Sequence, residues 1–229
     1  MIQTVVNQVI PRIEEALPHL DGEDTQVVVE IRNFYCGLHN LVHMAEVMSS
    51  AANDAEIAEF DGNPPKSPDS FPKSAKEASA VPLVRKACKV FAAGGDAKSG
   101  CHGKAAIFLA PVLKEFGVKS IPLTQFHGHR FNILAFNSEY VYCLWEPMAE
   151  FLRLNHENGL TASLLFDLNV KFNRRVTRAF AIMSKLYASP LARMLEDKEV
   201  DVVRMGRAYA ELVSALESAS ETPQELLEG

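Results

Sequence analysis

Apolar residues recur every three or four positions through most of this 229-residue chain, and that spacing most constrains its fold. In the clearest stretch, from Cys36 to Phe60, six apolar residues form one stripe: Leu38, Leu41, Val42, Ala45, Met48 and Ala52. A helical period places such residues on one face, which must then be buried against a partner. The pattern therefore predicts a mainly α fold.

The same spacing predicts further helices at 4–17, 78–93, 103–116, 139–154, 161–170, 174–187 and 200–216. Gly94-Gly95 should end the helix at 78–93, and Gly117 should cap the next one in a left-handed conformation. Only 25–31, which is rich in β-branched residues, and 120–123 favour extended backbone. We expect a helical domain with one or two short strands near the N-terminal third.

Four prolines, Gly62 and several Ser and Lys residues fall within 61–76, which is typical of a surface loop or linker. The predicted organisation has four parts: a strand-helix segment at 1–60, a Pro-rich loop at 61–78, a helical domain at 79–221 and a frayed tail at 222–229.

Four scattered cysteines are too few for a disulfide scaffold, so reduced thiols inside a cell are expected. The N-terminus lacks the basic start and apolar core of a signal peptide. The longest apolar run, 105–113, is far shorter than the ~20 residues that cross a membrane. We therefore predict an intracellular protein without a membrane segment.

The net charge of −6 conceals an uneven distribution. Residues 1–60 carry two basic and ten acidic groups, residues 61–190 carry 17 and 10, and residues 191–229 carry four and nine. A basic middle segment of +7 between acidic ends can meet a polyanion, or it can pair with the chain's own carboxylates. Both interpretations stay open at this point.

Cys36-Gly-Leu-His39 places a thiol and an imidazole three residues apart on one helix face, with His43 one turn further. Together with Cys101 these groups form a possible zinc site, since zinc prefers sulfur and nitrogen ligands. The alternative is a half-buried cysteine with histidines that hydrogen-bond locally. Zinc is the one cofactor that the sequence suggests.

The stretch Gly94-Gly-Asp-Ala-Lys-Ser-Gly-Cys-His-Gly-Lys104 is glycine-rich, basic and opens a helix. Its backbone amides can cradle an anion, or the glycines can serve a plain turn between helices. It is not a nucleotide-binding P-loop, because the Gly-Lys-Ser/Thr ending is absent. The turn is the simpler interpretation.

Basic and aromatic residues of the middle segment are candidates for contact with nucleic acid, where cations meet phosphate and Phe stacks on a base. The alternatives are a polar turn at 127–132 and a solvated helix face at 174–178, with Asp167 close enough in sequence to pair with it. The candidate residues are Lys89, Lys98, Lys104, His127, His129, Arg130, Phe131, Asn132, Arg174, Arg175 and Arg178.

The order of three motifs carries a resemblance: Phe34-Tyr-Cys-Gly-Leu-His39, the glycine-rich stretch from Gly94, and Arg130-Phe-Asn-Ile-Leu134. Over about 28–205 the chain is similar to transposon-derived proteins of animal genomes. It resembles the Cys-x-x-His and helical-insertion region of hAT-like DNA transposases, whose catalytic core has an RNase H-like fold. The resemblance implies part of that core followed by a helical insertion, and it slightly favours a nuclear location.

The resemblance also implies a protein without the transposase activity. The family's first two catalytic Asp would precede Met1, its final Glu has no clear counterpart, and Phe131 replaces the Trp of an Arg-Trp-Asn segment. Strand transfer needs carboxylates that hold two metal ions. We expect a catalytically silent protein that binds DNA. A helical protein-protein or homodimerisation module and a zinc-binding protein are the alternatives.

Overall fold

The computed structural model describes residues 37–65, 67, 77–96, 98–125, 133–155, 158–197 and 202–222, without the side chains of 37–40 and 202–204. Internal contacts group the chain into Met1–Asn40 and Leu41–Gly229. All described residues from Leu41 onward belong to the second unit. Its elements in chain order are α3 (Gly37–Glu59, which begins in the first unit), α4 (Ala80–Phe91), α5 (His102–Glu115), α6 (Ile133–Cys143), α7 (Trp145–Leu154), α8 (Gly159–Asn169), α9 (Lys171–Met183), the π-helical turn η2 (Ser184–Ala188), α10 (Ser189–Glu196) and α11 (Val202–Glu221).

The prediction of a mainly α protein is confirmed. The helices expected at 36–60, 78–93 and 103–116 are α3, α4 and α5, with ends within two residues of the prediction. Gly117 takes the left-handed conformation (φ 69°) just after α5, and Val118 N–H bonds back to the Leu113 carbonyl at 2.9 Å. These agreements reflect local signals, since periodicity and caps act within a few residues.

Strands are absent from the part of the chain that the structure describes, and 120–123 forms irregular backbone. The expected strand there is wrong, and an RNase H-like sheet is not supported by the described residues. The helix expected at 4–17 and the strand expected at 25–31 lie outside them.

The single helix expected at 139–154 is wrong in its limits. The structure has two helices, α6 and α7, and the first begins at Ile133. Pro147 lies in the first turn of α7, where a missing N–H costs nothing, and it could not donate to the Cys143 carbonyl in a continuous helix. The helix expected at 174–187 likewise starts at Lys171 and passes into η2 and α10.

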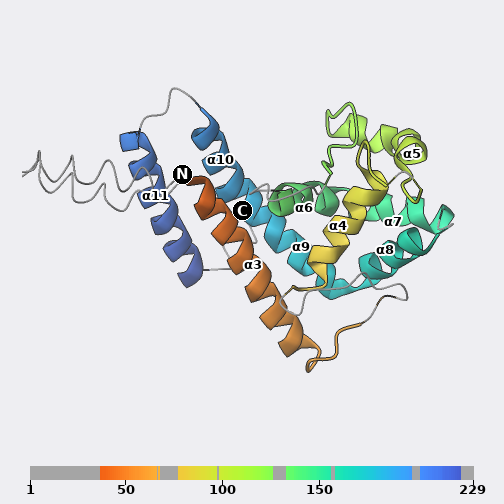
Figure 1. Cartoon of the computed structure of the whole chain (residues 1–229), viewed down its shortest axis with the longest axis horizontal. Helices are drawn as coiled ribbons and strands as arrows, with labels where there is room; N and C mark the ends of the chain where they lie inside the picture. The colour runs from red at the N-terminus through yellow and green to blue at the C-terminus, as the bar shows by residue number, and fades with distance from the viewer. Residues whose placement is uncertain are drawn as a thin grey trace, which may run out of the picture. The chain divides into compact units, whose positions relative to one another are not determined.

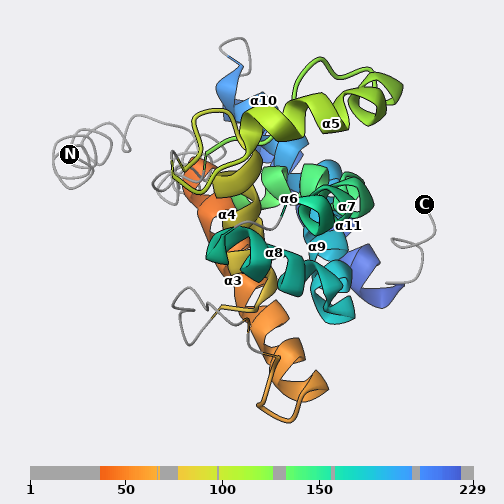
Figure 2. The same cartoon turned by 90° about the vertical axis from the view of Figure 1, so that its right-hand side faces the viewer.

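The core forms around α4, which contacts α5, α6, α8 and α9 (Figures 1 and 2). Ten of its twelve residues are buried, and the exceptions are Arg85 and Lys89. A helix that is apolar nearly all round must be surrounded by neighbours, which explains its central place. Phe91 at its end meets Phe151 of α7 edge to face, with ring centroids 5.6 Å apart.

Trp145 begins α7 and is 3 % exposed. Its indole N–H donates to the Leu168 carbonyl at the end of α8 at 3.1 Å. Among the described residues, no helix combines the length and the apolar character needed to cross a membrane.

Candidate nucleic-acid interface

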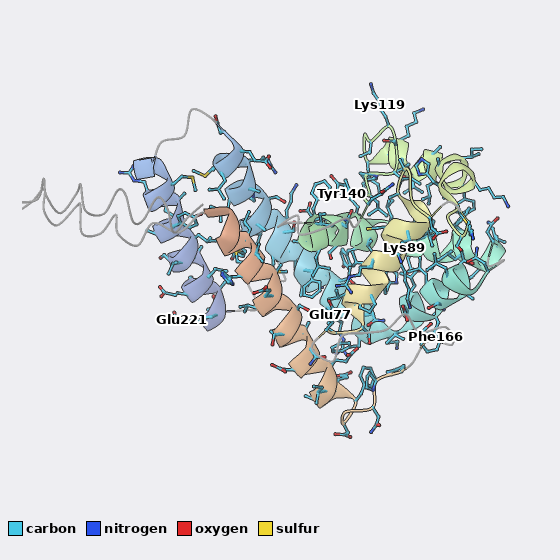
Figure 3. All side chains as sticks on the ribbon, viewed as in Figure 1. Glu77, Lys89, Lys119, Tyr140, Phe166 and Glu221 are labelled. Atoms are coloured by element: carbon cyan, nitrogen blue, oxygen red, sulfur yellow. The ribbon has the colours of Figure 1, made fainter. Side chains whose placement is uncertain are left out.

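Three predicted lysines lie around one short connection, the α4–α5 loop at 92–101. Lys89 is in the last turn of α4, Lys98 is in the loop, and Lys104 is in the first turn of α5. All three are exposed, and Figure 3 shows Lys89 on its helix. The backbone pins the loop to α4: Asp96 N–H donates to the Lys89 carbonyl at 2.9 Å, and Cys101 N–H to that of Val90 at 2.8 Å.

Asp96 organises the interior of this loop. One oxygen of its carboxylate accepts the N–H groups of Lys98 and Ser99, at 2.9 and 2.7 Å. Those amide bonds, with the nearby charge of Lys89, hold the pKa of Asp96 below its usual value. The chain's own carboxylate thus occupies the amides that an anion would need, so the structure supports the turn and not the anion cradle.

Glycine is required at two loop positions by close backbone approach. A Cβ on Gly95 would overlap the Lys89 carbonyl oxygen, and one on Gly100 would overlap the Asp96 carbonyl oxygen. Gly94 has a positive φ of 70°. The loop is therefore a tightly packed turn that holds Lys98 between the ends of the two helices.

The predicted basic face of α9 is largely neutralised within the chain. Arg174 donates to Glu146 of α7 at 2.8 Å, and Arg175 donates to Glu59 of α3 at 2.5 Å. Arg178, on the same helix, is half-buried. Asp167 does not pair with this face as expected, because it binds Lys86.

Five predicted contact residues, 127 and 129–132, lie outside the described residues. Cys36 does also, and of His39 only the backbone in α3 is described. Cys101 is half-buried as the residue before α5. Within the described ranges, no three His, Cys, Asp or Glu side chains are placed to hold a metal ion.

A buried polar cluster joins α4 to α8 and was missed by the sequence analysis. The Lys86 ammonium lies 2.6 Å from Asp167 Oδ2 and donates to Ser163 Oγ at 2.6 Å. Ser163 Oγ is 2.5 Å from Ser67 Oγ. Glu56, 1 % exposed, accepts the Ser79 N–H nearby.

Burial governs the chemistry of this cluster. Desolvation raises the pKa of Asp167, Lys86 lowers it and the Glu56 charge raises it. The sequence signal for it is weak: Lys86 lies inside an apolar run, and its neighbour Arg85 reaches Glu77 in a partly buried position. Which of Arg85 and Lys86 is buried depends on how α4 is rotated about its axis against its neighbours. The cluster links α4 to α8 through one ion pair and one hydrogen bond from the same ammonium group.

A groove of about 490 Å³ follows one face of α5. Ala106, Ala110 and Leu113 line it along the helix, and His102 lies at its start. Lys114 and Lys119 line its other end, where Lys119 extends outward (Figure 3). The sequence indicates this groove only through the pair of alanines at helical spacing, and it was not predicted.

Comparison with known proteins gives no match: no protein-family model, no curated protein and no solved structure is similar to this chain.

Proposed function

We propose that this chain is a catalytically silent, transposon-derived helical protein that binds the phosphate backbone of nucleic acid through Lys89, Lys98 and Lys104. The observation that carries the proposal is the exposure of these three lysines around one hydrogen-bonded loop. From Lys89 to Lys104 the sequence has three lysines and one carboxylate, Asp96. The motif resemblance supports nucleic acid as the polyanion.

The proposed interface is smaller than the whole basic middle segment, because it leaves out the basic face of α9. Arg174 and Arg175 have carboxylate partners on other helices, so they contribute little net positive field. Three lysines on a loop fix a protein on phosphates without reading bases. We therefore expect modest affinity and little preference for sequence.

The salt dependence of the affinity for DNA gives a quantitative test of binding through three lysines. Each phosphate contact on duplex DNA releases counterions and contributes about −0.9 to the slope of log K against log salt. Three contacts predict a slope of about −2.7, which is about a 40-fold loss of affinity between 50 and 200 mM salt. Fluorescence anisotropy with labelled duplex DNA measures this slope directly.

The decisive variant is Lys89→Ala/Lys98→Ala/Lys104→Ala, which should remove most of the slope, with each single change lowering it by about 0.9. The matched control Lys171→Ala/Lys185→Ala/Arg193→Ala removes three exposed cations from other elements and should keep the slope. Equal binding by the two triple variants, or no wild-type binding at low salt, would contradict the proposal.

A further inference from the structure

The groove on α5 lies on a helix at the edge of its unit in both views (Figures 1 and 2). His102, Ala106, Ala110 and Leu113 lie on one face of α5, about 16 Å in length at 1.5 Å per residue. The two alanines keep the floor low enough for the side chains of another helix. Nearby, Ile107 is 80 % exposed, a large apolar side chain without cover.

The charged side chains that line the groove, Lys114 and Lys119, are both basic. His102 lies at one end, Lys114 and Lys119 lie at the other, and no lining residue is acidic. Apart from His102, no ring lines the floor, whereas bases of single strands bind by stacking on aromatic side chains. An apolar floor with two lysines at one end is complementary to a helix that carries apolar residues in its middle and carboxylates at its end.

The chain itself contains such a helix in α11. None of its described side chains, Met205–Glu221, is buried, although the helix packs against α10. Among its exposed ridges, one has apolar or small residues followed by two carboxylates: Gly206, Ala210, Val213, Glu217 and Glu221. Their spacing of three and four residues places small residues first, then Val213, which is 52 % exposed, then two carboxylates.

We infer that the α5 groove binds α11 of a second copy of this chain. In a parallel alignment, one turn separates Val213 from Glu217 on α11, and one turn separates Ala110 from Lys114 on α5. Val213 then enters the groove over Ala110 while Glu217 and Glu221 meet Lys114 and Lys119. A single alignment of the two helices therefore satisfies both the apolar contact and the two ion pairs.

Two such contacts, each α11 in the other copy's groove, close a two-fold symmetric dimer. The contact uses one medium-sized apolar side chain and exposed ion pairs, so the dimer is weak and depends on protein concentration. It uses none of the three lysines of the proposed nucleic-acid surface. Loss of DNA binding and loss of dimerisation are therefore separable.

Charge exchange tests the proposal in sedimentation-velocity runs over a wide concentration range. Lys114→Glu/Lys119→Glu should weaken the dimer at least about tenfold, because like charges replace opposite ones, and so should Glu217→Lys/Glu221→Lys. Combining all four should restore it. The matched control Lys171→Glu/Lys185→Glu reverses two exposed lysines outside the groove and should leave the dimer unchanged.

Helical content by circular dichroism verifies that the variants are folded, since every changed side chain is exposed. A monomer at all concentrations overturns the proposal. A dimer that the two groove reversals leave intact, or that the fourfold exchange fails to restore, also overturns it.

Discussion

Replacing Lys86 by Met should destabilise the protein far more than any surface charge change. The Lys86 side chain is 5 % exposed and that of Asp167 is 9 % exposed, so water cannot take over when the ammonium is removed. Met fills a similar space but leaves the Asp167 carboxylate buried near Glu56. Breaking a buried pair from one side costs about 3–5 kcal/mol, a large part of a total stability of about 5–15 kcal/mol.

The neighbouring residue provides a matched control. Arg85 pairs with Glu77 in a partly buried position, where the two side chains are 38 % and 19 % exposed. Arg85→Met should cost about 1 kcal/mol or less. In urea unfolding followed by Trp145 fluorescence, with a slope of about 2 kcal/mol per molar, Lys86→Met should lower the midpoint by about 2 M. The double variant Lys86→Met/Asp167→Asn should recover much of the loss.

The pH dependence of the free energy of unfolding is a second test of the buried Lys86–Asp167 pair. The pKa of Asp167 is raised in the folded protein, so the native state binds its proton more tightly than the unfolded chain does. Stability from this group therefore increases as the pH falls from the folded pKa towards the ordinary value, and it decreases as the pH rises through that window. Lys86 lowers this pKa, so Lys86→Met should raise it further.

The stability deficit of Lys86→Met should accordingly be largest near neutral pH and shrink on acidification, as the unpaired carboxyl takes up a proton. A deficit no larger than that of Arg85→Met would refute the account of the buried pair. So would a deficit that stays constant from neutral to acidic pH.

Two further predictions concern the loop and the cysteines. Gly100→Ala should cost about 1–3 kcal/mol in urea unfolding, since a Cβ would overlap the Asp96 carbonyl, whereas Gly103→Ala, with open space around it, should be neutral or slightly stabilising. Equal effects would contradict the packing of the loop. Cys88 is 1 % exposed and burial raises its pKa to about 12, so it should resist alkylation in the native state. The exposed Cys143 should react before Cys88 in a peptide-mapped time course, and faster at higher pH, because burial and Glu139 raise its pKa as well.

The candidate interface was only partly predictable from sequence. The exposure of Lys89, Lys98 and Lys104 follows from a basic loop between two helices, and composition indicated that loop. The pairing of Arg174 and Arg175 with carboxylates could not be predicted from the sequence, because Glu146 lies 28 residues from Arg174 and Glu59 lies 116 residues from Arg175. A count of charges along the chain cannot tell a cation that faces solvent from one that has a partner.

Sequence alone determined the helical class and the limits of α3, α4 and α5, because hydrophobic period and glycine caps act over a few neighbouring residues. Pro147 is a local signal of the same kind that the prediction of one helix at 139–154 did not use: a proline has no N–H to donate to the Cys143 carbonyl, so a break before α7 was readable from the sequence. Tertiary structure decided which of Arg85 and Lys86 enters the core, and it brought Asp167 from 81 residues away to meet it. Burial and long-range pairing depend on how helices rotate against one another, and no local pattern records that rotation.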